Sequence, residues 1–348
     1  MTTHTTGNTL PPEPEVPGAS GQDRRGWLRA RWPRLLISVI LLAIVVSRVD
    51  RRELGAVLSR IDLGFLGLAL GASFAMLGLN ALRWQVMLLA QGTRVPLRLV
   101  VYYYFIGAFF NTFMPTSVGG DFVRVLSASR YTGRRSVALA SVVVERLLGF
   151  FALVPVSLAG ILLTYREFQN PRLLVVLEGV ALFMFALVGV MLSNRVAMGI
   201  IRLLRPLLSR FRQIDIEEKL RSVYEALRLY GEKRAALAGG FLLSLLSRLV
   251  WILGGAWIAS ALSAEMITFP RLLVVVPLVE LARVVPVSLS GVGVREGSFA
   301  GLMAQFGTGE TETIVLAFLF YLLLTVNGMA GGVLYLIRTA VSAGHRGT

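Results

Sequence analysis

Long apolar runs, separated by charged or turn-forming residues, constrain this chain more than any other feature. A helix that crosses a lipid bilayer needs about 20 mainly apolar residues, within a range of roughly 17 to 25. The composition fits such helices, because 55% of the 348 residues are hydrophobic and only 16% are charged. The sequence therefore predicts an all-α polytopic membrane protein and not a soluble domain. Full membrane spans are expected near 33–49, 63–89, 137–163, 173–192, 235–262 and 312–338.

Two further apolar segments, 97–114 and 271–286, end at proline and glycine and not at a basic loop. Arginine-rich loops are usually cytoplasmic. The arginines on both sides of the first segment, including those of "RYTGRR" at 130–135, therefore favour a helix that enters the membrane, turns and returns to the same side. The same argument applied to 271–308 gives a second hairpin from the opposite face. We expect about six full spans plus two re-entrant helical hairpins, with eight full spans as the alternative.

The two breaks have related sequences. "PTSVGGDFVR" at 115–124 aligns without a gap on "PVSLSGVGVR" at 286–295, and five of the ten positions are identical. The chain is therefore expected to consist of two halves of opposite orientation, each with the order span, span, hairpin, span. Inverted repeats of this kind occur in transporters, whose substrates bind near the midplane where broken helices meet. The residues assigned to the breaks are Pro115, Gly119, Gly120, Pro286, Gly291 and Gly293.

The remaining segments complete the domain organisation. Residues 1–24 are polar and rich in proline, which predicts a disordered tail, and 25–340 form the expected membrane domain, followed by a tail at 341–348. The arginine-rich amphipathic segment 195–234 is expected to be cytoplasmic. These assignments place both termini in the cytoplasm, in a multi-pass protein of the plasma membrane.

Ionisable residues inside apolar segments are the main candidates for a binding site, because each costs about 2.5 to 3.5 kcal/mol at the membrane centre unless it meets a partner or water. Arginines exceed what local neutralisation requires, so a net basic cavity for an anionic headgroup is expected. Simpler roles are also open: Glu280 and Arg283 neutralise each other, Asp121 caps a helix, and Arg83 beside Trp84 is an interfacial anchor. The candidates are Asp121, Arg124, Glu145, Arg146, Glu280, Arg283, Arg295 and Glu296.

Several kinds of chemistry are excluded by residues that the chain lacks. It has no cysteine, and its two histidines, His4 and His345, lie in the tails. Thiol catalysis, cysteine-ligated metals and buried histidine chemistry are therefore excluded, and no catalytic residue, metal or cofactor is expected. The formal net charge of +15 comes mainly from arginines between apolar runs. This pattern indicates contact with anionic lipid headgroups and not with nucleic acid.

Four stretches together resemble the transmembrane domain of the lysylphosphatidylglycerol synthase family, whose members are also described as flippase-like membrane proteins. They are "LRWQVML" (82–88), "YYYFIGAFFNTFMPTSVGGDFVR" (102–124), "VVVERLLGF" (142–150) and "PVSLSGVGVREG" (286–297). The resemblance extends over about residues 35–340, implies a domain that moves lipids between leaflets, and adds Asn111 to the candidate site. Larger members carry a soluble aminoacyltransferase domain after this one, whereas this chain stops at Thr348, so aminoacylation is not expected.

These observations predict a flippase or transporter for an anionic or aminoacylated phospholipid or a lipid-linked intermediate, and not an enzyme. In this hypothesis Arg124, Arg146 and Arg295 pair with phosphate, while nearby carboxylates hold the arginines or accept a cationic headgroup or a proton. A membrane-embedded transferase acting on a phospholipid or polyprenyl phosphate, with Asp121 or Glu145 as base, is one alternative. A non-catalytic scaffold is another. Membrane lipids are the expected partners, with a homo-oligomer or lipid-biosynthesis enzymes as further candidates.

Overall fold

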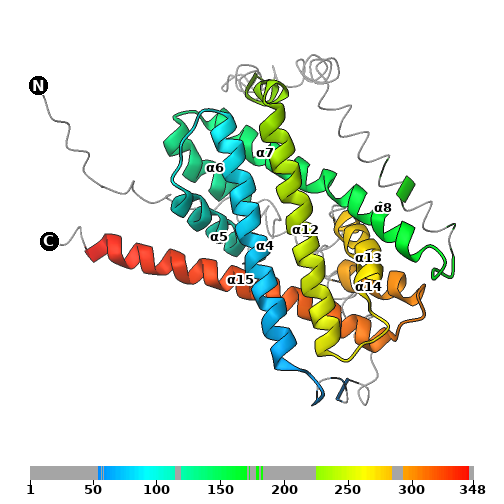
Figure 1. Ribbon diagram of the computed structural model, residues 1–348. Coiled ribbons are helices and arrows are strands. Elements are labelled where there is room, and N and C mark those ends of the chain that lie inside the picture. The colour runs from blue at the N-terminus through cyan, green and yellow to red at the C-terminus, as the bar shows by residue number, and fades with distance from the viewer. Residues whose placement is uncertain are drawn as a thin grey trace, which may run out of the picture.

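The computed structural model is helical and contains no strand within the residues that it describes. These are Leu54, Gly55, Val57, 59–113, 119–170, Arg172, Glu178, Gly179, Leu182, 225–283 and 293–344. The helices labelled in Figure 1 are α4 (Leu63–Ala90), α5 (Leu97–Phe113), α6 (Gly119–Thr132), α7 (Arg135–Phe151), α8 (Leu153–Thr164), α12 (Arg234–Ala261), α13 (Phe269–Ala282), α14 (Val294–Ala304) and α15 (Glu310–Gly344).

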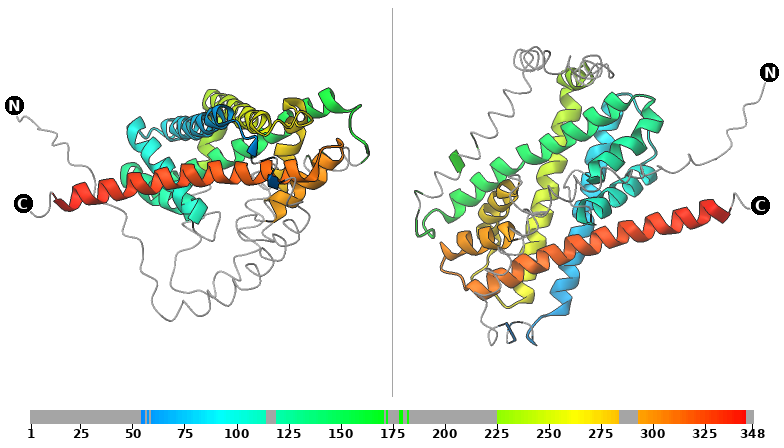
Figure 2. Two further views of the ribbon diagram at one scale, coloured as in Figure 1. Left: turned by 90° about the horizontal axis from the view of Figure 1, so that it is seen from below. Right: turned by 180° about the vertical axis from the view of Figure 1, so that it is seen from behind.

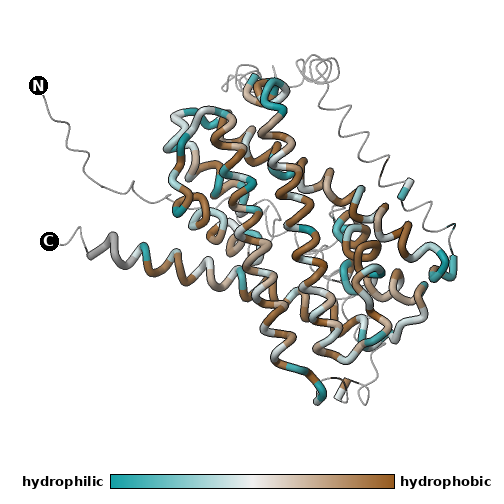
Figure 3. The backbone as a smooth tube through the Cα atoms, viewed as in Figure 1, coloured by the Kyte–Doolittle hydropathy of each residue, from teal (hydrophilic) through white to brown (hydrophobic). Residues whose placement is uncertain are grey.

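Four helical segments are long and apolar enough to cross a membrane, namely Leu63–Ala90, Arg135–Thr164, Arg234–Ala261 and Glu310–Thr339. They match four of the six predicted spans. The second of them consists of α7 and α8, which follow each other around Ala152. Figure 3 shows apolar residues along most of α4, α12 and α15. This is the composition expected of helices whose outer surface faces lipid.

Several predicted segments lie outside the described residues. They include the predicted spans near 33–49 and 173–192, apart from Glu178, Gly179 and Leu182 in the second. They also include the N-terminal tail, residues 195–224 of the amphipathic segment and the last four residues. The break residues Pro115, Pro286 and Gly291 also fall outside.

Helices α4 and α12 form the centre of the bundle and run antiparallel. The backbone N–H of Asp62, just before α4, donates to the carbonyl of Ala261 at the end of α12 over 3.0 Å. Small residues keep the two helices close, because a Cβ atom on Gly254 would lie 3.2 Å from the Cβ of Ala72. Close approach at small side chains is a common way for membrane helices to associate. Figure 1 shows the two helices side by side.

Two pairs of shorter helices flank this centre. In the first pair, α5 has 17 residues and α6 has 14. In the second, α13 has 14 residues and α14 has 11. At about 1.5 Å per residue, each helix reaches at most about 26 Å, compared with about 30 Å for the hydrocarbon core of a bilayer. Helix α14 begins after Gly293, whose φ of 82° is one that glycine adopts readily.

Contacts between the helices occur in matched sets. Helix α5 packs on α15, and the corresponding helix α13 packs on α8. Helix α6 packs on α7, and the corresponding helix α14 packs on α15. The central helices contact each other, and each also contacts the first short helix that follows it in the chain. The views in Figure 2 agree with this arrangement. Helices α4 and α12 have 28 residues each and start 171 positions apart, at Leu63 and Arg234.

Two glycines with the same separation occupy equivalent places in the two sets of contacts. Gly160 of α8 lies against α13, where an added Cβ atom would be 2.7 Å from the backbone carbon of Leu273. Gly331 of α15 lies against α5, where an added Cβ atom would overlap the carbonyl of Phe105. In both places only glycine allows the backbones to approach this closely.

Candidate functional site

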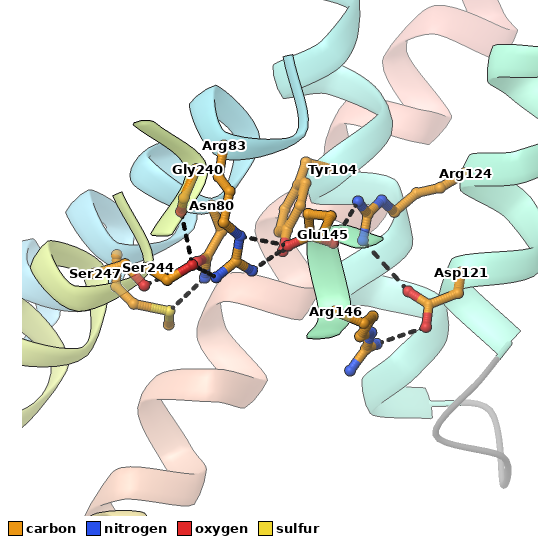
Figure 4. A network of polar contacts seen from close by, with 11 residues as sticks. Asn80, Arg83, Tyr104, Asp121, Arg124, Glu145, Arg146, Gly240, Ser244 and Ser247 are labelled. Carbon is orange, nitrogen blue, oxygen red and sulfur yellow. Dashed lines mark hydrogen bonds and ion pairs between the residues drawn. The ribbon is translucent and has the colours of Figure 1, made fainter. Parts of the chain in front are cut away.

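Glu145 on α7 is the centre of the largest group of buried charges. It is fully buried and accepts hydrogen bonds from two arginines on other helices. Arg83 of α4 donates from Nε to Oε1 over 2.9 Å and also forms an ion pair through Nη2. Arg124 of α6 donates from Nη2 to Oε2 over 2.9 Å. Figure 4 shows this arrangement, in which one carboxylate connects α4, α6 and α7.

Aromatic side chains fix the position of Arg124 from its other faces. Its guanidinium lies 4.4 Å from the ring centroid of Trp84 and 4.2 Å from that of Tyr104. Contacts of this kind add an electrostatic attraction to the ion pair. The Tyr104 hydroxyl also donates to Glu145 over 3.3 Å. Within the described part of the chain, Nε of Arg124 is buried and has no hydrogen-bond partner.

Asp121 and Arg146 form the exposed edge of the same group. Asp121 accepts from Arg124 Nη1 over 3.3 Å and pairs with Arg146 Nη2 over 2.8 Å. The side chain of Arg146 is 43% exposed and that of Asp121 is 14% exposed, whereas that of Arg124 is only 2% exposed. A continuous chain of ion pairs therefore leads from the buried Arg83 to the accessible Arg146 (Figure 4).

The packing of α5 against α6 determines where this group lies. A Cβ atom on Gly120 would overlap the carbonyl of Gly107, so the two helices meet at their backbones. The Asn111 side chain accepts from the backbone N–H of Gly120 over 2.8 Å. Asn111 therefore positions the start of α6. Asp121 lies within the first turn of α6 and not before it, where its negative charge suits the helix dipole.

A second group of charges lies at the start of α14, against an aromatic ring of α15. Arg295 pairs with Glu296, and both side chains are buried. Glu296 also accepts from the backbone N–H of Gly293 over 2.7 Å, which secures the start of α14. The guanidinium of Arg295 lies 4.6 Å from the ring centroid of Tyr321, and its buried Nε has no partner among the described residues. Arg295 thus has the same kind of surroundings as Arg124, 171 positions earlier.

Glu280 and Arg283 form a third, partly exposed pair on α13. Glu280 Oε1 accepts from Arg283 Nη1 over 2.9 Å, and both side chains are 25% exposed. Mutual neutralisation of these two residues is therefore present, as the simpler interpretation of the sequence proposed. Their exposure still leaves both groups accessible.

The structure corrects the interpretation of Arg83. The sequence suggested an interfacial anchor, but its side chain is only 5% exposed and pairs with Glu145. Its Nη1 also donates to Ser244 Oγ on α12 over 2.9 Å. Arg83 lies seven residues before the end of α4, about 10 Å along the helix. That depth was the signal in the sequence, whereas nothing in the sequence indicated Ser244.

The predicted site residues thus fall into three groups, and Asn111 lies beside the first of them. Among the described residues, no three histidine, aspartate or glutamate side chains meet in a way that would hold a metal ion. Six arginines in or beside these groups outnumber four carboxylates, which suits the binding of an anion. The arginines are Arg83, Arg124, Arg146, Arg248, Arg283 and Arg295, and the carboxylates are Asp121, Glu145, Glu280 and Glu296.

Comparison with known proteins bears on the whole of this region. A family model described as the lysylphosphatidylglycerol synthase TM region matches residues 32–332. The matched range contains all the charged groups described above. No curated protein matches the chain.

Proposed function

We propose, given that this chain belongs to the family of the lysylphosphatidylglycerol synthase TM region, that it moves a lipid between the leaflets of the cytoplasmic membrane. The lipid would be an anionic or aminoacylated phospholipid or a lipid-linked intermediate. The observation that carries this proposal is the chain of ion pairs around Glu145, which connects buried arginines to the accessible Arg146.

The charges favour an anionic headgroup over a neutral one. A buried carboxylate that binds two arginines keeps both of them charged and oriented. A buried charge in a membrane costs free energy unless it is paired in this way. With Arg248 included, the arginines in or beside the groups described above exceed the acids by two, so a phosphate would improve the balance of charge. A guanidinium binds phosphate through two parallel hydrogen bonds, with a geometry that ammonium groups cannot match.

The architecture supports a transport cycle between two inverted halves. The matched helix contacts and the constant separation of 171 positions are what two related halves would produce. Under this proposal, the pairs α5–α6 and α13–α14 are re-entrant hairpins, and one half rocks against the other around the bound lipid. The six spans of the complete domain would place both termini in the cytoplasm.

The same contacts argue against the alternative of a transferase. A general base needs a free carboxylate, but Asp121 and Glu145 both accept from arginines. We therefore propose a transporter without catalytic activity, whose partners are anionic membrane lipids. A homo-oligomer or an association with lipid-biosynthesis enzymes would be compatible with this function.

Reconstitution into liposomes tests the proposal. We expect the protein to move fluorescent phosphatidylglycerol between leaflets, measured by the fraction of label that dithionite can reach. Arg146→Ala should slow this movement at least about fivefold, because it removes the accessible cation. Arg135→Ala, on an exposed residue of the same helix, is the matched control and should leave the rate unchanged. Absence of movement for phosphatidylglycerol, its aminoacylated form and polyprenyl phosphate would contradict the proposal.

A further inference from the structure

Arg248 occupies the middle of the central helix α12. It lies fourteen residues after Arg234 in a helix of 28 residues, which is about 21 Å along the helix axis. A helix of this length extends beyond both sides of a hydrocarbon core of about 30 Å. Arg248 is therefore close to the midplane if α12 crosses the membrane, at the depth where a charge is most costly.

Arg248 differs from the other arginines of the site in having no ion-pair partner among the residues that the structure describes. Each of the five others pairs with a carboxylate: Arg83 and Arg124 with Glu145, Arg146 with Asp121, Arg283 with Glu280, and Arg295 with Glu296. Within the described residues, Arg248 forms no ion pair or hydrogen bond, and its Nε is buried. Its guanidinium therefore has no direct ion pair with a carboxylate in these parts of the chain.

The position of Arg248 connects the two halves of the site. Ser244, one turn before Arg248 on α12, accepts from Arg83 of α4 in the first half, and α12 also packs on α13, which carries Glu280 in the second half. The hydroxyl groups near it on α12 are already used, because Ser244 accepts from Arg83 and Ser247 donates to Asn80 over 2.8 Å. The surroundings therefore supply a carboxylate that Arg283 already holds, and additional positive charge.

A guanidinium at this depth needs either water or an anion. We propose that Arg248 is the main anion-binding residue of the site, and that it holds the phosphate of an anionic lipid midway between the charged groups of the two halves. This inference rests on the proposed lipid transport and identifies the residue on which it depends. The paired arginines would attract the headgroup from each side, while Arg248 binds it between them. A phosphate binds here without displacing an existing carboxylate, which it would have to do at Arg124 or Arg295.

Ligand binding to the purified protein tests this role directly. Thermal unfolding in detergent, followed by tryptophan fluorescence, would be measured with dihexanoylphosphatidylglycerol, dihexanoylphosphatidylcholine and inorganic phosphate. We expect the anionic lipid to raise the unfolding temperature and to bind at least about tenfold more weakly to Arg248→Gln, since a charge-assisted bond is lost. Arg248→Lys should retain part of the affinity, and Arg135→Gln should retain all of it.

The other ligands identify what Arg248 recognises. Weaker stabilisation by phosphatidylcholine and by inorganic phosphate supports an anionic lipid. Equal stabilisation by inorganic phosphate would overturn the lipid assignment in favour of a soluble anion, and equal stabilisation by phosphatidylcholine would overturn the preference for anionic headgroups. Unchanged binding of phosphatidylglycerol to Arg248→Gln would overturn the role of Arg248 itself.

Stability without ligand separates a binding role from a structural one. Arg248→Gln should be at least as stable as the wild type, because Arg248 forms no ion pair within the described residues and Glu280 keeps its pair with Arg283. A large loss of stability would overturn the proposal. Liposome transport distinguishes the role of Arg248 from the proposed function. If lipid binding depends on Arg248 but the protein moves no lipid, only the transport function would be contradicted. Wild-type transport by Arg248→Gln, with unchanged binding, would contradict only the role of Arg248.

Discussion

At the scale of single residues, we expect the replacement of Glu145 to reduce stability most among the residues of the site. Replacement by glutamine would leave Arg83 buried without a counter-charge and would leave Arg124 with only its longer ion pair to Asp121. Breaking a buried ion pair by removing one partner costs about 3 to 5 kcal/mol, so we expect Glu145→Gln to lower the unfolding temperature strongly. Asp121→Asn is the matched control. Because Asp121 is partly exposed, its replacement should reduce the free energy of unfolding much less. Equal unfolding temperatures for the two variants would show that Glu145 does not hold the site together.

The sequence identified most of these residues but not their roles. Glu145 and Arg146 could be predicted because charges inside an apolar run are expensive and therefore conspicuous. The difference in burial between Glu145 and Arg146 could not be predicted. Adjacent residues on a helix point in different directions, and only the packed bundle decides which of them is buried. The role of Arg83 depends on its distance to Glu145 across two helices, which no local pattern contains.

At the scale of helices, the contact between α5 and α6 controls the position of the site. Gly120→Ala would force the two backbones apart where they touch at Gly107. Such overpacking costs about 1 to 3 kcal/mol and would move Arg124 away from Glu145. We expect lower thermal stability and slower lipid movement in liposomes.

Gly78→Ala is the control for this change, because an added Cβ atom on that residue of α4 would meet nothing within 4 Å. It should leave both measurements unchanged or raise stability slightly, since alanine favours a helix more than glycine. If Gly78→Ala and Gly120→Ala behaved alike, the close contact of α5 and α6 would be unimportant.

The lengths of the helices were easier to predict than their boundaries. Runs of apolar residues predicted four of the membrane-length segments, because a bilayer imposes its thickness on any helix that crosses it. The predicted span 137–163 is formed by two helices, α7 and α8, which the apolar pattern alone does not separate. The start of α14 could be predicted from Gly293, whose conformation suits glycine.

At the scale of the whole molecule, the proposed re-entrant arrangement predicts which loops share a side of the membrane. The chain has no cysteine, so single cysteines can be introduced and labelled without background. We expect Arg94→Cys and Arg134→Cys to react with an impermeant maleimide from one side, and Glu265→Cys and Ala304→Cys from the other. If the two cysteines of either pair were labelled from opposite sides, the alternative of eight full spans would be favoured.

The matched glycines test whether the two halves are equivalent. Gly160→Ala and Gly331→Ala should each lower stability by about 1 to 3 kcal/mol, because each glycine lies against the backbone of a helix from the other half. Thermal unfolding would measure the loss, with Gly301→Ala as the control, since an added Cβ atom there meets nothing within 4 Å. A loss at one glycine only would show that the contacts are not equivalent.

The same glycine contacts have a consequence for how the chain assembles. Helix α8 packs on α13 and α15 packs on α5, so a helix of each half packs against a helix of the other. Neither half can then complete its own packing during synthesis until the other has entered the membrane. Residues 1–194 and 195–348, produced as separate polypeptides, should therefore be degraded when expressed alone and should form an active complex when expressed together.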